Sequence, residues 1–127
     1  MRLWHQDLIP HLPRQQLLGM HREICALRGK GWGKKHATVD YVFKNPFNKL
    51  LFFHFQVMLE MKRRGYKASE ERGDAQYRGK KLGIDRDIHY KNVAVKEMNP
   101  VYEEHDNTYL KECIENLREK NIELDLG

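Results

Sequence analysis

Several features are scarce in this sequence of 127 residues, and each absence excludes a class of protein. No apolar run approaches the roughly 20 residues that a membrane-spanning helix needs. The opening residues, from Met1 to Asp7, contain no continuous apolar core of the kind that a secretion signal has. Only two cysteines are present, Cys25 and Cys113, and we interpret them as free thiols because their spacing is not a paired one. We therefore expect a cytoplasmic protein without a membrane segment.

The histidines show no spacing that is typical of metal ligands. No two of them are three or four residues apart, the separation that places two ligands on one face of a helix. The histidine pattern therefore predicts no metal site, and nothing else in the sequence predicts a cofactor. The seven histidines are His5, His11, His21, His36, His54, His89 and His105.

What the sequence does have is an uneven distribution of charge around a net charge of +5. Residues 1–35 carry seven basic and two acidic residues, and residues 36–81 carry ten and five. Residues 82–127 carry six basic and eleven acidic residues. A basic body with an acidic end favours a polyanionic partner that approaches from one side. A basic surface that is merely solvated would give the same counts, so the charge alone leaves both interpretations open.

The first predicted helix runs from about Pro13 to Leu27. Leu17, Met20, Ile24 and Leu27 recur at three- and four-residue spacing, which indicates one apolar face. Pro13 fits the first turn of this helix, where its missing N–H is not needed. The glycines that follow Leu27 are expected to end the helix.

Two further helices are predicted. Asn45-Pro46 is typical of a helix start, with Asn45 as N-cap, and the helix should end at the basic residues 62–64 and Gly65. Its phenylalanines are expected in the core, and His54 on a side of the helix. Asp106 or Asn107 should cap a last helix that ends near residue 121. Residues 66–100 are expected to form mostly loops. The sequence thus predicts an all-α fold, a single irregular domain over residues 1–127 with three main helices joined by long basic loops.

The glycine-rich segment 29–36 is a candidate for contact with nucleic acid. Glycines allow the backbone to approach phosphates, Lys30, Lys34, Lys35 and His36 supply positive charge, and Trp32 offers a face for stacking. The segment matches neither a Walker A loop nor a dinucleotide-binding turn. A flexible basic turn with Trp32 packed into the core is the alternative.

Glu23 is unusual because it is one of only two acidic residues among the first 35. Arg14, Arg22 and Arg28 lie around it in the sequence and are candidates for contact with DNA. A carboxylate on a surface that faces DNA repels phosphate, so its presence calls for a reason. Glu23 is either a catalytic group or the partner of a nearby arginine or lysine, and both interpretations stay open at this point.

The segment Gln15-Gln16-Leu17-Leu18-Gly19-Met20-His21-Arg22-Glu23 resembles the first-helix signature of the pyrimidine-dimer DNA glycosylases of the endonuclease V type. In that family an Arg-Glu pair closes a similar run at about the same distance from the N-terminus. Further similarities are Arg2, the segment 36–38 before the second helix, the basic end of that helix at 62–66, residues 77–79, and the last helix around 110–120.

The resemblance implies an all-α, metal-free DNA glycosylase/AP lyase without a cofactor. Its expected partner is double-stranded DNA with a damaged or abasic site, and we expect a monomer. Carried over to this chain, the α-amine of Met1 is the nucleophile that forms an imine with the sugar C1′, and Glu23 is the acid/base group. Arg2 and Arg22 would lie close to the reacting nucleotide and its phosphate.

Two departures from the family leave the lesion open. The chain ends in the acidic segment 121–127, without the aromatic residues of the family's best-known member. Ala26 occupies the position of an arginine one turn after the glutamate. The resemblance therefore implies AP lyase activity more directly than pyrimidine-dimer specificity. The alternatives are a non-catalytic module for binding DNA or structured RNA, and a protein-interaction domain that uses the acidic last helix.

Overall fold

The computed structural model contains helices and turns, with no β-strand among the residues that it describes, and the all-α prediction is confirmed. These residues are 3–34, 39–67, 70–74, 76–80, 82–86 and 101–124. The elements are η1 (Gln6–Leu8), α1 (Arg14–Arg28), α2 (Asp40–Phe43), α3 (Phe47–Arg63), η2 (Glu70–Gly73) and α4 (Asn107–Glu119). None of these helices is long and apolar enough to cross a membrane, a finding limited to the described ranges.

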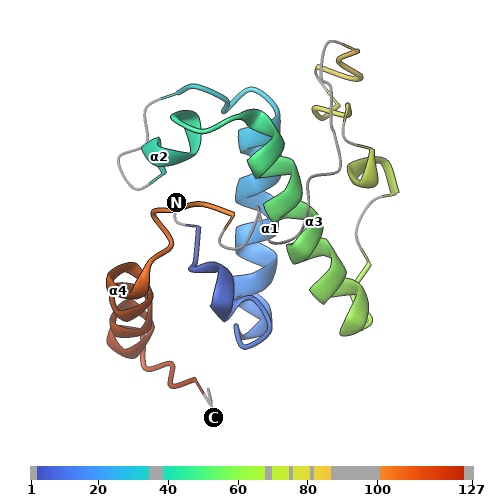
Figure 1. Cartoon of the computed structure of the whole chain (residues 1–127). Coiled ribbons are helices and arrows are strands. Elements are labelled where there is room, and N and C mark those ends of the chain that lie inside the picture. The colour runs from blue at the N-terminus through green and yellow to red at the C-terminus, as the bar shows by residue number, and fades with distance from the viewer. Residues whose placement is uncertain are drawn as a thin grey trace.

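The helices α1 and α3 pack side by side at the centre of the molecule (Figure 1). All four residues of the predicted apolar stripe of α1 are buried, with at most 1% of their surface exposed. The facing residues of α3 include Leu50, Phe53, Val57 and Met61, which are equally buried. Burying one such side chain contributes roughly 1.5–3 kcal/mol, so this helix pair is the main source of stability. The spacing of apolar residues had predicted the face of α1. Of the phenylalanines of α3 that were expected in the core, Phe53 is fully buried, and Phe47, Phe52 and Phe55 are half-buried.

The helix ends differ in part from the predictions. Pro13 and Pro46 are themselves the N-caps of α1 and α3, and neither helix has a side-chain cap. Asn45 was predicted as the N-cap of α3, and this is wrong, because Pro46 has that position; the Asn45 side-chain amide donates instead to the carbonyl of Tyr41 in α2. Asp106 caps α4, since its carboxylate accepts from the backbone N–H of Tyr109 at 2.8 Å.

Residues from the opposite end of the chain hold the N-terminal segment in place. The backbone N–H of Gln6 donates to His105 Nδ1 at 3.1 Å, and the Gln6 side chain accepts from the N–H of Val101 at 2.7 Å. Leu3 and Trp4 are buried in the same core as Cys113 of α4. Figure 1 shows the segment that leads into α4 passing beside the start of the chain.

The end of α3 fixes the rest of the N-terminal segment. Glu60 pairs with Arg63 and with Arg64, and Arg64 donates to the carbonyl of Leu12 at 2.7 Å and to that of Pro10 at 3.1 Å. Loop carbonyls that a helix does not satisfy need such donors. The basic end of α3 therefore has two roles. It complements the helix dipole, and the Arg64 side chain holds the chain just before α1 by hydrogen bonds.

Of the region 66–100, the structure describes the short helix η2 and a turn in which Tyr77 and Ile84 form a single antiparallel bridge. This agrees with the prediction of loops and short turns, and residues 87–100 lie outside the described ranges. The turn packs on the end of α1, because Arg78 donates to the carbonyls of Arg28 and Gly29.

Candidate functional site

Glu23 lines a pocket of about 290 Å³ on the outer side of α1. The pocket is built by three parts of the chain that are distant in sequence: the N-terminal segment, the first turns of α1 and the end of α4. Its lining residues are Trp4, Gln15, Gln16, Gly19, Met20, Arg22, Glu23 and Lys120. Residues four and three apart on a helix share a face, which explains why so many of the lining residues come from α1.

The pocket combines one carboxylate with two cations. Arg22 is exposed and Glu23 is half-buried. The Lys120 ammonium lies 5.2 Å from the centre of the Trp4 ring, a distance at which a cation is attracted to the indole face. Gly19 leaves open space in the wall, since a side chain there would meet only the tip of Arg22, at 3.9 Å. The site is therefore positive at its rim, and its acidic lining residue is Glu23.

Some of the other predicted site residues are exposed, and others lie outside the described residues. Arg14, Lys30 and Lys34 are exposed, as such a role requires, and the Arg14 guanidinium also lies 5.2 Å from the centre of the Tyr66 ring. Met1, Arg2, Lys35 and His36 lie outside the described residues. The pairing of the Met1 amine with Glu23 therefore stays a prediction.

Trp32 is half-buried rather than presented to solvent as a free stacking surface. Its ring meets Phe43 edge-on with 5.2 Å between the ring centres, and Phe47 in the same way at 4.8 Å. Of the two alternatives for Trp32, these contacts favour packing against the core.

Arg28 was predicted to bind DNA, and the structure corrects this. The side chain is fully buried, and its guanidinium donates to the backbone carbonyls of Arg72, Asp74 and Tyr77 at 2.7–3.0 Å. Burial, together with the nearby Arg72, lowers the pKa of Arg28 to about 10. A guanidinium that satisfies three loop carbonyls in the interior cannot reach a phosphate. Its role is to bind the loop 72–77 to the end of α1.

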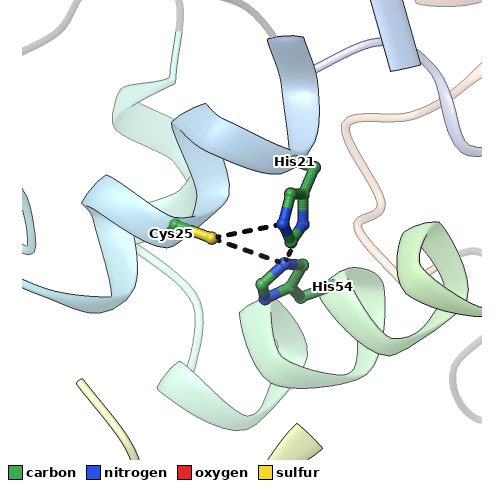
Figure 2. Close-up of side chains that lie close together, drawn as sticks. All are labelled: His21, Cys25 and His54. Atoms are coloured by element: carbon green, nitrogen blue, oxygen red, sulfur yellow. Dashed lines mark hydrogen bonds between the residues drawn. The ribbon is translucent and has the colours of Figure 1, made fainter. Parts of the chain in front are cut away.

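Behind the Glu23 face of α1, three side chains that could ligate a metal come together (Figure 2). His21 and Cys25 of α1 point toward His54 of α3, and their ligand atoms lie within 4.8 Å of one another. His21 Nδ1 is 2.8 Å from His54 Nε2, and Cys25 Sγ is 3.8 Å from His21 Nε2. His54 had been expected on a side of its helix, but it is fully buried.

The position of Arg28 determines which nitrogen of each histidine carries the proton. Arg28 Nη1 lies 2.9 Å from His54 Nδ1, and a guanidinium can only donate. Nδ1 of His54 is therefore the acceptor, and Nε2 carries the proton and donates to His21 Nδ1. His21 then carries its proton on Nε2, toward Cys25. Burial and the Arg28 charge hold the pKa of His54 well below its usual value, so the ring is neutral.

This arrangement favours a hydrogen-bonded relay over a metal site. If His54 bound a metal through Nε2, its remaining proton would lie on Nδ1 and would point at the N–H of Arg28. Two donors would then face each other at 2.9 Å. Arg22, Arg28 and Arg72 also lower the pKa of His21, after burial, and the same positive potential opposes a cation. Burial raises the pKa of Cys25, which keeps it a thiol.

Sequence reasoning missed several of these residues. The histidines were compared with one another, but Cys25 follows His21 by four residues, which places both on one helix face and could have been noticed. Nothing in the sequence around Trp4 or Lys120 indicates that these residues line the pocket. They meet there only because α4 returns to the N-terminal segment.

The chain is thus an all-α protein in which one carboxylate lies in a pocket lined by cations. The family model described as pyrimidine dimer DNA glycosylase matches residues 1–74, more than half of the chain. This chain is therefore a member of the pyrimidine dimer DNA glycosylase family. All residues that line the Glu23 pocket except Lys120 fall within the match. Comparisons with curated proteins and with solved structures gave no match.

Proposed function

We propose that this protein cleaves DNA at a damaged or abasic nucleotide as a glycosylase/AP lyase, with the α-amine of Met1 as nucleophile and Glu23 as acid/base group. One observation carries the proposal: Trp4, three residues after the chain start, lines the same pocket as Glu23. Covalent geometry limits the α-amine to within about 11 Å of the Trp4 Cα atom. We therefore expect the Met1 amine to come within reach of the Glu23 carboxylate.

The pocket suits an amine nucleophile. An α-amine has a reference pKa of about 7.7–8.0, well below the value of about 10.4 for lysine. Nearby cations favour the neutral, nucleophilic form of an amine, and Arg22 and Lys120 line this pocket. At the reference pKa, roughly a tenth of such an amine is neutral near pH 7, far more than for a lysine side chain.

In the proposed reaction, the amine nitrogen attacks C1′ of the deoxyribose. The bond between C1′ and the base breaks, and the base leaves with the bonding electrons and a proton. Glu23 assists the opening of the sugar ring, which leaves an imine between C1′ and the amine. Glu23 then removes a proton from C2′, and the bond between C3′ and its oxygen breaks, which cuts the strand. Hydrolysis of the imine restores the amine.

Borohydride trapping tests this proposal. Duplex DNA with one abasic site is incubated with protein that has a native N-terminus, and mass spectrometry of the intact protein verifies that the chain begins at Met1. We expect a covalent adduct whose linkage maps to the Met1 amine. Glu23→Gln should form the adduct but cut the strand at least about 100-fold more slowly, as expected for loss of a general base. The exposed Glu119→Gln serves as the matched control and should react like the wild-type protein.

Blocking the α-amine by acetylation should abolish the adduct while leaving DNA binding in place. Salt-dependent binding without any adduct from the wild-type protein would instead support the second candidate function, a non-catalytic module for DNA or structured RNA. An adduct that maps to a lysine would overturn the assignment of the nucleophile.

A further inference from the structure

A second pocket, of about 360 Å³, lies where α1 ends. Its walls are the turn after α1 and the loop that contains η2 and the Tyr77–Ile84 bridge. Four of its lining residues are cationic and none is acidic. The lining residues are Cys25, Ala26, Gly29, Lys30, Gly31, Arg72, Arg78, Gly79, Lys80 and Leu82.

Glycine is needed where these two walls meet. A Cβ atom on Gly29 would lie 2.8 Å from the carbonyl oxygen of Arg78, and one on Gly31 would lie 2.7 Å from that of Ala26. Both contacts are closer than real Cβ atoms allow, and both involve backbone that cannot move aside. Gly29 therefore lets the basic turn after α1 contact the second basic loop, and Gly31 lets that turn pack back on the end of α1. Lys30 and Lys80 then line one pocket.

Carboxylates balance the positive charge around this second pocket only in part. Arg28, at the end of α1, is buried and bonds to carbonyls and to His54, and the Asp74 charge offsets part of its own. Arg72 lies 4.9 Å from the centre of the Tyr77 ring, and its Nη1 is buried with no hydrogen-bond partner among the described residues. The neighbouring Arg72 charge is one reason that the pKa of Arg28 is lowered. Arg78 is the exception, since Asp85 pairs with it at 3.3 Å. An anion in the pocket would offset the remaining charge.

One exposed face of α1 connects the Glu23 pocket with this second pocket. Gln15, Gly19, Arg22 and Ala26 follow one another at four- and three-residue spacing, and Lys30 continues the row in the turn. The small residues Gly19 and Ala26 leave room for a nucleic-acid backbone to lie close to the helix. Arg22 stands between them, beside Glu23. The row thus offers positive charge at Arg22 and Lys30, and space at Gly19 and Ala26.

We propose that the second pocket receives a backbone phosphate of the strand that carries the lesion. Glu23 and Gly29 are six residues apart, which is about 9 Å along a helix that rises 1.5 Å per residue. A DNA strand advances about 3.4 Å per nucleotide along its axis. With α1 lying along the duplex axis, the bound phosphate is about three nucleotide steps from the nucleotide whose C1′ reacts. This inference rests on the proposed function, because Glu23 marks the position of that nucleotide.

Neutral linkages test the position of the phosphate. A set of duplexes, each with one tetrahydrofuran abasic analogue and one methylphosphonate linkage, moves the neutral linkage stepwise away from the analogue on either side. We expect the loss of affinity to peak about three steps away on one side, at about tenfold, as for the loss of one charge-assisted contact. With the double variant Lys30→Gln/Lys80→Gln, the linkage at that position should cause no further loss.

The salt dependence of binding gives a second readout. Each phosphate that the protein neutralises contributes about 0.9 to the slope of log K against log salt, so loss of the one phosphate contact in the double variant should lower the slope by about 0.9. Lys111→Gln, which removes an exposed lysine of α4, is the control and should leave the slope unchanged. A neutral linkage that weakens the double variant and the wild-type protein equally at every position would overturn the inference.

The two proposals can fail separately. Borohydride trapping by the wild-type protein on a natural abasic site reports the amine chemistry, and the methylphosphonate series reports the phosphate contact. A positional phosphate effect without any adduct would retain the pocket and reject the catalytic proposal. An adduct without a positional effect would retain the catalytic proposal and reject the phosphate pocket. Circular dichroism should show that the double variant is folded, since both lysine side chains are exposed.

Discussion

The hydroxyl of Tyr109 in α4 donates a hydrogen bond to the backbone carbonyl of Leu3. This single contact joins residues 106 positions apart, and it connects the part of the chain outside the family match to the residues just after the chain start. His105 Nε2 lies 2.7 Å from the hydroxyl of Tyr41, and its Nδ1 accepts from the backbone of Gln6. The acidic last helix therefore acts, through these contacts, as a support for the N-terminal segment.

Tyr109→Phe should slow imine formation without weakening DNA binding, because it releases Leu3 and so the segment that carries the proposed nucleophile. We expect the free energy of unfolding to fall by about 1 kcal/mol, the usual net value of one hydrogen bond. Single-turnover trapping rates at saturating protein measure the first effect, and a binding titration on the tetrahydrofuran duplex measures affinity. Glu112→Gln, an exposed change on the same helix, is the control. Equal trapping rates for wild type and Tyr109→Phe would show that the contact serves stability alone.

The buried histidines predict that stability decreases as the pH falls below about 6.5. Burial lowers the pKa of His54 well below its usual value, and burial together with His5 lowers the pKa of His105 to about 3. Below pH 6.5 the unfolded chain therefore binds protons that the folded protein does not, which favours unfolding. Each such histidine should cost about 1.4 kcal/mol at pH 5.5.

Urea unfolding at pH 5.5, 6.5 and 7.5 measures this dependence. For His105 the loss should continue down to about pH 3, where the folded protein also takes up the proton. His105→Gln should make the curve shallower, whereas a change at the exposed His11 should not. A stability that stays constant between pH 7.5 and 5.5 would contradict the buried, neutral state of these rings.

The arginines Arg22 and Arg28 of α1 should respond to substitution in opposite ways. Arg28→Met leaves loop carbonyls and His54 without their donor in the interior, and we expect a loss of about 3–5 kcal/mol in the free energy of unfolding. Arg22→Met should change stability by less than about 0.5 kcal/mol, because its side chain is exposed. It should, however, lower the salt slope of DNA binding by about 0.9. Thermal unfolding and binding isotherms at several salt concentrations separate the two results.

Gly29→Ala should destabilise the protein by several kcal/mol and weaken DNA binding, because the added methyl group meets the Arg78 carbonyl at 2.8 Å. Gly73→Ala is the matched control: nothing lies within 4 Å of a Cβ atom there. It should be neutral or stabilise slightly by restricting the unfolded chain. The comparison is made by urea unfolding, and similar losses for both variants would argue against a tight contact between the two loops.

Local patterns in the sequence determined the helical framework of this protein. The apolar rows of α1 and α3, the cap at Asp106 and the end of α3 at its basic residues follow from spacing within one or two turns. Such spacing acts over distances that a helix itself fixes, so it can be deduced without the rest of the fold. The signature that ends in Arg22-Glu23 likewise indicated the family from a short, continuous run of residues.

Tertiary structure alone decided what surrounds Glu23 and where the arginines of α1 point. Lys120 and Trp4 meet in the pocket because α4 returns to the chain start, a contact between residues more than a hundred positions apart. Arg28 and Arg22 look alike in the sequence, yet the packing of α3 and of the loop 72–77 buries one and leaves the other exposed. Helical periodicity gives the face on which a residue lies. Which partner covers that face depends on long-range packing, and this is why the relay from Arg28 through His54 to His21 could be found only in the folded protein.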